Sequence, residues 1–512
     1  DGYAFAAYYN SSMSLPDTKL QVVDFSKCAK PIYIGKMAFG MQVFLGADLE
    51  ATGDIFRDDF KISDVVLRDD FDQKFDLKMV RGAEILAFYG LYCAHGNINL
   101  ENLRAANTNS FAGFGYWAGR GTDLSGIGAD VVVRFGKYTV LDGTGIFAGS
   151  SITEMIFDGT PRISSALFGG NSANLTLRKV TFTADNLGIE SYAFSGCIML
   201  GNIEFKGSVA SIGDYAFMQV GVASIKYELV QTIFGPIPKM EGDLKVTFDS
   251  TCKRIGSYAF ARSAIKEITL PAGLEKLESY SFLACEDLAK VTIAKDCNLE
   301  TVDGIGLKGA PFVMSDNISE YIVETGHEKF MSKGGAIFTK DGKTIIAVPS
   351  NCATDPATLL DGVEEIGDYA FAYAYGVEGE EGKDVSVNIV IPETVKKIGV
   401  GAFLYSTNLK SVVLPTTITE IPDVAFANCE NLVSVDFNGN SAITSIGAAA
   451  FVNSAIEEIT LPRDLTSIGV QAFSGCTKLT SVAFPRGITE VPVQAFANCT
   501  SLRTVFFNKV ET

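Results

Sequence analysis

Histidine and cysteine are the side chains most often used for nucleophilic or metal chemistry, and the chain has two histidines and ten cysteines. The histidines are His95 and His327, so a Ser-His-Asp or Cys-His site would have to use one of them. Cys93-Ala94-His95 is the nearest approach to such a pair. Zinc needs three or four donors, and the neighbouring sequence does not supply them. We therefore expect a loop histidine there, and we predict no catalytic residue and no metal site.

Residues 304–309 read Gly-Ile-Gly-Leu-Lys-Gly, which is the glycine spacing of a phosphate-binding loop. That chemistry requires a helix to begin directly after the last glycine, whereas Pro311 follows. We expect a turn at this place, and a loop at the glycine-rich segment 113–121 around Trp117. The sequence therefore predicts no cofactor.

Four aspartates cluster at Asp69, Asp70, Asp72 and Asp76 and could in principle hold calcium. The ligand order of an EF-hand and its central glycine are missing. We favour a solvated acidic face over a calcium site.

The charge balance excludes one class of partner. The chain has 60 acidic and 42 basic residues and a formal net charge of −18. Nucleic-acid binding depends on clustered lysine and arginine, so we expect no nucleic-acid partner. Hydrophobic residues make up 47%, but the sequence has no apolar run of about 18 residues, so we predict no transmembrane segment in this chain.

The apolar residues follow a repeat instead. Near the C-terminus, an Ala-Phe pair recurs with its phenylalanine at steps of 23, 25, 22 and 23 residues. Self-similarity at this period is typical of a solenoid, in which each coil buries its apolar face against its neighbours. The phenylalanines of this block are Phe403, Phe426, Phe451, Phe473 and Phe496.

Within one coil the apolar period changes. Between Ile468 and Leu479 the apolar residues are spaced at 4, 1, 3 and 3, which predicts one face of a short helix. From Leu479 to Phe484 the apolar residues alternate with others, which predicts a strand, and Pro485 follows it. Each coil is thus predicted to contain a short helix, a strand and two turns.

Five of the cysteines occupy one position of the repeat, three residues after the phenylalanine: Cys197, Cys285, Cys429, Cys476 and Cys499. Other copies have Ser263, Ser406 or Ser454 there. A position that accepts cysteine or serine favours a small, buried, weakly polar group, so we expect reduced packing cysteines. Disulfide bonds between stacked coils are the alternative.

The repeat extends upstream with decreasing regularity. Phe194, Phe217, Phe260, Phe282 and Phe371 continue the core position. We predict divergent repeats with insertions in residues 1–130, repeats in 131–302, an insertion in 303–360 and regular repeats in 361–512. The insertion contains Asp-Gly at 341–342 between two apolar runs, which predicts a β-hairpin with a type I′ turn.

Residues 398–415, 446–462 and 468–485 resemble the BspA-like (treponemal-type) leucine-rich repeat family, whose repeat reads Ile-Gly-x-x-Ala-Phe-x-x-Cys-x-x-Leu-x-x-Val-x-Leu-Pro. The resemblance implies an α/β repeat solenoid, a right-handed leucine-rich-repeat superhelix with coils of about 22–25 residues. It also implies a secreted or surface-attached protein that adheres to host proteins or other cells, and it supplies no catalytic residue. No signal peptide is visible, and the chain opens inside what reads as a repeat. We expect a processed or truncated product located outside the cell or at its surface.

The remaining candidate for function is the outward residue of each strand, because stacked strands place these residues in one column on an extended surface. We predict that this column and the insertions bind proteins, with glycans as a second class of partner. Two alternatives are a structural protein that self-associates end to end and an enzyme housed in the irregular N-terminal region. The predicted column residues are Ile156, Glu204, Thr269, Thr292, Val413, Asp436, Thr460, Ala483 and Phe506.

Overall fold

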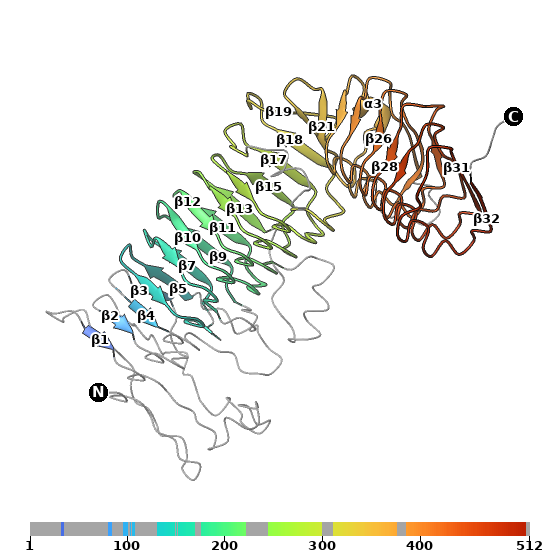
Figure 1. Cartoon of the computed structure of the whole chain (residues 1–512). Coiled ribbons are helices and arrows are strands. Elements are labelled where there is room, and N and C mark those ends of the chain that lie inside the picture. Colours follow the sequence, from blue (N-terminus) through green and yellow to red (C-terminus); the bar gives the residue numbers. More distant parts are fainter. Residues whose placement is uncertain are drawn as a thin grey trace, which may run out of the picture. The chain divides into compact units, whose positions relative to one another are not determined.

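The computed structural model describes residues 131–148, 152–168, 176–221, 244–299, 311–375 and 386–507, residues 103 and 150, and four strand segments nearer the N-terminus. The chain divides into two compact units, unit 1 (residues 1–265) and unit 2 (residues 266–512). Both are parallel β-solenoids, with about 14 turns of ~23-residue coils among the described residues. Figure 1 shows the strands of successive coils stacked side by side within each unit. The predicted segments 1–130, 131–302, 303–360 and 361–512 describe repeat regularity and remain a prediction.

Unit 1 is built from three parallel sheets. The six-stranded sheet has the order β3 (Gly96–Leu100), β5 (Val131–Phe135), β7 (Glu154–Phe157), β9 (Lys179–Phe182), β11 (Asn202–Phe205), β13 (Lys245–Phe248). A second sheet contains β8 (Arg162–Ile163), β10 (Leu187–Ile189), β12 (Val209–Ile212) and β14 (Arg254–Ile255). The third contains β1 (Ile32–Ile34), β2 (Val80–Ala83), β4 (Ala105–Asn107) and β6 (Val140–Asp142).

The described strands of unit 2 form sheets of three to five strands. Three of them contain the longer strand of each coil: β15 (Glu267–Leu270), β17 (Lys290–Ile293) and β18 (Glu320–Val323); β23 (Val387–Val390), β25 (Leu409–Val413) and β27 (Ser434–Asp436); β29 (Glu458–Thr460), β31 (Ser481–Phe484) and β32 (Thr504–Phe507). The two-residue strands are β16 (Lys276–Leu277), β22 (Glu365–Ile366), β24 (Lys397–Ile398), β26 (Glu420–Ile421), β28 (Ser445–Ile446) and β30 (Ser467–Ile468).

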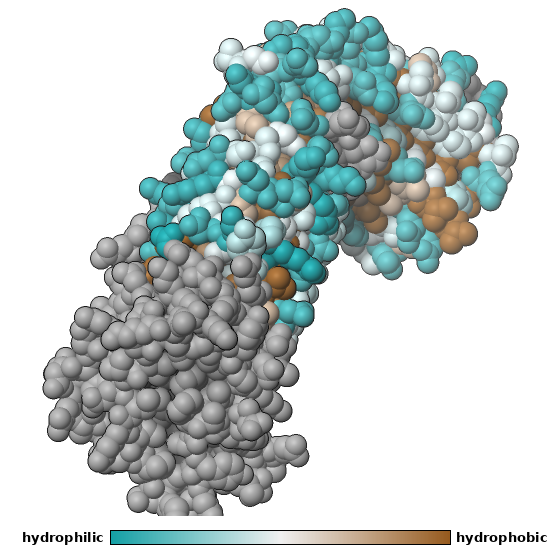
Figure 2. All heavy atoms as spheres, turned by 90° about the vertical axis from the view of Figure 1, so that its left-hand side faces the viewer, coloured by the Kyte–Doolittle hydropathy of each residue, from teal (hydrophilic) through white to brown (hydrophobic). Residues whose placement is uncertain are grey.

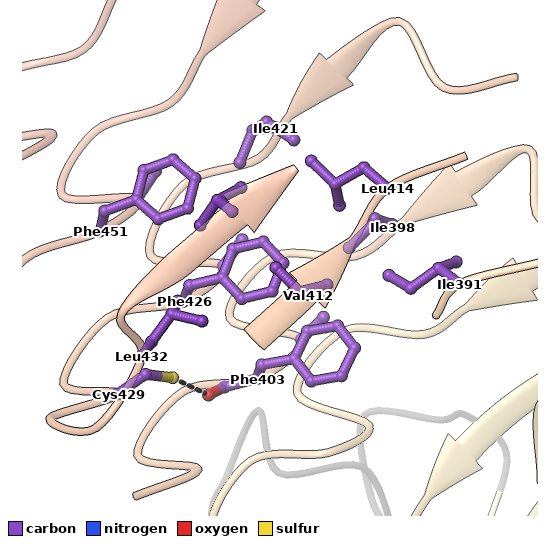
Figure 3. Packing of buried hydrophobic residues seen from close by; sticks show 14 of the residues in the cluster. Ile391, Ile398, Phe403, Val412, Leu414, Ile421, Phe426, Cys429, Leu432 and Phe451 are labelled. Atoms are coloured by element: carbon purple, nitrogen blue, oxygen red, sulfur yellow. Dashed lines mark hydrogen bonds between the residues drawn. The ribbon is translucent and has the colours of Figure 1, made fainter. Parts of the chain in front are cut away.

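Stacked phenylalanines form the core of both units. In unit 2 the rings of Phe371, Phe403, Phe426, Phe451, Phe473 and Phe496 stack with centroids 4.9–5.4 Å apart. Figure 3 shows three of these rings between the strand residues of successive coils. In unit 1 Phe194, Phe217 and Phe260 stack in the same way, at 5.2 and 5.3 Å. Burying each side chain stabilises its coil by about 2–3 kcal/mol.

Unit 1 has a second phenylalanine ladder, whereas the described strands of unit 2 have one such stacked pair, Phe484 and Phe507. The strand residues Phe135, Phe157, Phe182, Phe205 and Phe248 stack with centroids 4.7–5.3 Å apart. Phe194 contacts this ladder edge-on, at 5.8 Å from Phe182 and 6.3 Å from Phe157. The core of unit 1 is therefore more aromatic than that of unit 2.

The short helix predicted for each coil is wrong. The segment around each core phenylalanine is a run of turns, and α3 (Pro356–Leu360) is the one helix in the described part of the chain. The residues two before and two after the phenylalanine have positive φ, as at Gln471 (59°) and Gly475 (76°) around Phe473. A left-handed residue interrupts an α-helix. The segment is therefore not helical, although the spacing of its apolar residues is that of a helix.

The alternation of left- and right-handed residues aligns the peptide groups with the neighbouring coil. In this coil the amides of Gln471, Phe473 and Gly475 donate to the carbonyls of Val493, Ala495 and Ala497, at 3.2, 2.8 and 2.7 Å. The same pattern recurs at Tyr192, Phe194 and Gly196 in unit 1. The turns are thus held by hydrogen bonds between coils, as the strands are.

The hairpin predicted in the insertion is confirmed, but its turn differs from the prediction. β19 (Phe330–Lys333), β20 (Ala336–Thr339) and β21 (Thr344–Ala347) pair in antiparallel fashion. Gly342 has positive φ (72°), whereas Asp341 does not, so the loop is not type I′. Instead, the Asp341 carboxylate accepts from the Lys343 amide at 3.0 Å. β21 then pairs in parallel with β22, so the hairpin joins the solenoid sheet.

Candidate functional site

Strand register places the outward residues of unit 1 in one column. Ile156 pairs with Arg134 on one side and Thr181 on the other, and Thr181 pairs with Glu204. We call Arg134, Ile156, Thr181, Glu204 and Thr247 the unit 1 column. Two of its members, Ile156 and Glu204, were predicted from the sequence, and both are half-buried.

Ion pairs run along the unit 1 column and the adjacent outward positions. The Lys179 ammonium lies 3.6 Å from the Glu154 carboxylate and 3.5 Å from that of Glu204. Lys206 lies 3.5 Å from Glu204, and Thr181 donates to the same carboxylate at 3.3 Å. Partial burial raises the pKa of Glu204, but the two lysines outweigh it and the pKa lies below its usual range. These charges are therefore matched within the protein.

The corresponding column near the C-terminus is almost uncharged. Val390 pairs with Val413 and Val413 with Asp436, while Thr460 pairs with Ala483 and Ala483 with Phe506. The two sheets adjoin, since the Glu457 amide donates to the Val433 carbonyl at 3.4 Å. We call the following residues the C-terminal column: Val390, Val413, Asp436, Thr460, Ala483 and Phe506.

Two apolar members of the C-terminal column are open to solvent. Val390 is 63% exposed and Phe506 is 49% exposed. Figure 2 shows hydrophilic residues over most of the visible described surface, with apolar residues gathered in patches. Exposed apolar side chains beside small polar residues offer contact area to a partner without unmatched charge.

The first coils of unit 2 carry a third, short column. Thr269 pairs with Thr292, and Thr292 pairs with Ile322. Unit 2 also has charge ladders away from the C-terminal column, such as Lys343 and Lys396, at 2.7 and 2.8 Å from Glu364. Hydrogen bonds from both lysines lower the pKa of the Glu364 carboxyl to about 2.

Sequence reasoning placed nine residues in the columns and missed Arg134, Thr181, Thr247, Ile322 and Val390. All five are outward residues of strands with the same inward alternation, such as Val180 and Phe182 on either side of Thr181. Sequence reasoning missed them because the spacing between their coils is irregular. The buried apolar residues on either side of each one are the sequence signal that could have identified them.

The cysteine position of the repeat has a hydrogen-bonding role that explains its exchange with serine. Five side chains there donate to the carbonyl of the core phenylalanine one coil earlier: Ser315 to Phe282, Ser406 to Phe371, Cys429 to Phe403, Cys476 to Phe451 and Cys499 to Phe473, at 2.7–3.2 Å. Burial raises the pKa of Cys429 to about 12. Cys197, Cys285, Cys429 and Cys476 have no exposed surface, and Figure 3 shows the Cys429 contact.

His327 is buried and has a structural role. It is 2% exposed, and its Nδ1 accepts from the amides of Lys329 and Phe330, both at 3.1 Å. Burial lowers its pKa below the usual range. This histidine therefore fixes the start of the hairpin. His95, the Gly304–Gly309 motif, Trp117 and the Asp69–Asp76 cluster lie outside the described residues.

Few other groups of residues in the described part of the chain could bind a ligand or catalyse a reaction. A shallow pocket of about 310 Å³ is lined by Ser165, Glu190, Ser191, Gly213, Asp214 and Arg254. Its charged groups serve the fold, since Glu190 pairs with Arg162 and Asp214 accepts from Arg254 and the Ser257 amide. The described residues contain no cluster of potential metal ligands and no helix long and apolar enough to cross a membrane.

Comparison with known proteins identifies the repeat. A family model described as a BspA-type leucine-rich repeat region matches in six copies, at residues 161–235, 243–305 and 383–503, just over half of the chain. No curated protein matches the chain.

Several solved structures are similar to the chain. They include a leucine-rich cell surface protein from Faecalibacterium prausnitzii (18% identity, TM-score 0.36, covering 80% of this chain and 84% of that one). The pneumococcal vaccine antigen PcpA has 17% identity and a TM-score of 0.36, covering 80% and 75%. A leucine-rich repeat protein from Bacteroides ovatus has 18% identity and a TM-score of 0.36, covering 73% and 86%. At these scores the similarities carry no information about partners.

Proposed function

The chain belongs to the BspA-type leucine-rich repeat family, and from that premise we propose that it is a non-enzymatic binding protein of the cell surface or extracellular space. Its partners are proteins of host cells, other cells or the extracellular matrix. The C-terminal column is the surface that contacts them. The exposed apolar side chains of Val390 and Phe506 in this column are the observation that carries the proposal.

The contrast between the columns supports this choice. Charges beside the unit 1 column are matched by neighbours, so a partner would have to break or bury ion pairs there. The C-terminal column has small or apolar residues at five of its six positions, and contact with these residues buries no charge. Interface centres are depleted in charge and rich in large apolar side chains.

The experiment begins with a binding screen of the chain against an array of extracellular and cell-surface protein ectodomains. For each protein bound, the dissociation constant is then compared between the natural chain and Val413→Arg. Arginine at this half-buried position introduces a bulky charge, and we expect binding at least about tenfold weaker, or about 1.4 kcal/mol. Asp464→Arg, on an exposed turn after β29, is the matched control. Equal loss in the control, or unchanged affinity in Val413→Arg, would count against the column.

Self-association is a second candidate, favoured by the apolar side chains of β32. Val505, Phe506 and Phe507 are 42%, 49% and 62% exposed. Sedimentation of the natural chain and of Phe507→Asp tests it. Concentration-dependent oligomers that Phe507→Asp abolishes would support it, and a monomer at all concentrations would exclude it.

A further inference from the structure

The cysteine position of the repeat contains one pair that differs from the rest. Among the described residues, Cys476 and Cys499 are the two cysteines that occupy this position in consecutive coils. Cys429 lies between coils with Ser406 and Ser454, and Cys285 is followed by Ser315. Elsewhere in this column a thiol therefore has no thiol in the adjacent coil.

Backbone hydrogen bonds hold the coils of Cys476 and Cys499 in register. Gly475, directly before Cys476, donates its amide to the Ala497 carbonyl at 2.7 Å, and Phe473 donates to Ala495 at 2.8 Å. Coils paired in this way lie at strand separation, roughly 5 Å. That spacing falls within the Cα separations of disulfide bonds, about 4.4–6.8 Å.

The two thiols also point the same way. Cys476 Sγ lies 3.2 Å from the Phe451 carbonyl oxygen and Cys499 Sγ lies 3.1 Å from that of Phe473. The Ser454 hydroxyl, which occupies the same position one coil before Cys476, lies 3.2 Å from Cys476 Sγ, so side chains at this position in consecutive coils reach each other. The sulfur atoms are therefore neighbours without any movement of the coils.

The pair is asymmetric in access and in acidity. Cys476 is fully buried, whereas Cys499 is half-buried. The neighbouring Cys476 side chain lowers the pKa of Cys499 below its usual range. Burial raises the pKa of Cys429, which has no such neighbour, to about 12. Since the thiolate is the reactive form, Cys499 is the better nucleophile of the column.

We propose that Cys476 and Cys499 are a site of oxidative modification at which a small-molecule disulfide is exchanged for a disulfide bond between consecutive coils. The Cys499 thiolate attacks one sulfur of the small disulfide, forms a mixed disulfide and releases one small thiolate. The Cys476 thiol then loses its proton and displaces the second small thiolate from Cys499. One disulfide is consumed and one is formed, and two small thiols leave.

The bond adds a covalent cross-link between two consecutive coils, which are otherwise held together by the backbone between them, by packing and by hydrogen bonds. Both thiols give up their carbonyl acceptors on Phe451 and Phe473. The cross-link closes a loop of one coil, which limits the separation of the last described coils. The modification thus acts on the same end of unit 2 as the C-terminal column, but it does not depend on any binding partner.

Peptide mapping tests the proposal directly. The natural chain is incubated with oxidised glutathione, its remaining thiols are alkylated, and the digested peptides are identified by mass spectrometry. We expect a cross-linked peptide that joins Cys476 to Cys499, with thiols lost at these positions at least about tenfold faster than at Cys429. Cys476→Ser keeps a hydroxyl donor for the Phe451 carbonyl, and in this variant Cys499 should stop at the mixed disulfide with glutathione.

Several outcomes would overturn the proposal. A mixed disulfide that persists on Cys499 of the natural chain would show that Cys476 does not resolve it. Equal reaction rates at Cys429 and Cys499 would indicate general unfolding, and complete resistance of Cys499 would show an inert packing thiol. Because the mapping of the natural chain decides among these results, the proposal stays testable even if Cys476→Ser does not fold.

Discussion

The two units use the same coil but differ in core and surface. In unit 1 two phenylalanine ladders meet edge to face, and ion pairs link the outward residues. In the C-terminal coils of unit 2 one long phenylalanine ladder is surrounded mainly by aliphatic residues, with a single stacked strand pair, Phe484 and Phe507, beside it. The outward column there is nearly uncharged. A repeat fixes the coil geometry and leaves the outward residues free. The uncharged column is consequently where a partner can be contacted at the smallest desolvation cost.

Removing one core phenylalanine from each unit has the largest expected effect. Phe194→Ala and Phe426→Ala should each destabilise their coils by about 3–5 kcal/mol. The loss should be greater for Phe194, because its ring contacts Phe157, Phe168, Phe182 and Phe217, whereas Phe426 stacks on Phe403 and Phe451. Hydrogen exchange measures the opening of each coil separately. Equal losses would show that the second ladder adds nothing to unit 1.

The second-largest effect should come from mild acid, which should destabilise unit 2 more than unit 1. Burial lowers the pKa of His327, and Nδ1 already accepts two amides, so the native state opposes protonation. The unfolded chain binds this proton at its ordinary pKa of about 6.5. Unit 2 should therefore lose stability as the pH falls below that value, and β19 and β20 should lose protection from hydrogen exchange between about pH 7 and pH 5.

Unit 1 should resist this range, because the pKa of Glu204 is lowered and its stabilising effect is lost only as the pH falls through that lowered value. His327→Asn retains an acceptor oxygen and should remove the dependence in unit 2. A variant that still opens at pH 5 would assign the effect to a group other than His327.

The smallest effect should come from the ion pairs beside the unit 1 column. Lys179→Met removes the ammonium between Glu154 and Glu204, whose side chains are 29% and 22% exposed. Lys179 is itself 37% exposed, so the free energy of unfolding should fall by less than about 1 kcal/mol. The pKa of Glu204 should rise toward its ordinary value, as NMR titration would detect. An unchanged Glu204 pKa would mean that the ion pairs do not form in solution.

Much of this fold can be predicted from the sequence because the same residue pattern recurs in every coil. The spacing of Phe403, Phe426 and Phe451 predicts the coil length, and the alternation around Val482 predicts the strand. The exchange of Cys429 with Ser454 predicts a small polar group. The spacing alone does not reveal that this polar group donates to a phenylalanine carbonyl, because the carbonyl belongs to the neighbouring coil.

Two features could not be predicted, for physical reasons. The left-handed conformation of residues such as Tyr192 and Gln471 has no strong sequence signal, because hydrogen bonds to the next coil impose it on residues that do not favour it. The contact of Lys179 with Glu154 and Glu204 depends on register across irregular coils. In both cases the determining partner is one coil away.

The central claim is that partners contact the C-terminal column and not the unit 1 column. The most direct test is the dissociation constant of one protein from the ectodomain array, measured for the natural chain, Val413→Arg and Ile156→Arg. Ile156→Arg places the same side chain at a half-buried outward position of unit 1. We predict binding at least about tenfold weaker for Val413→Arg and unchanged for Ile156→Arg. Unchanged binding in Val413→Arg together with a loss in Ile156→Arg would contradict the account.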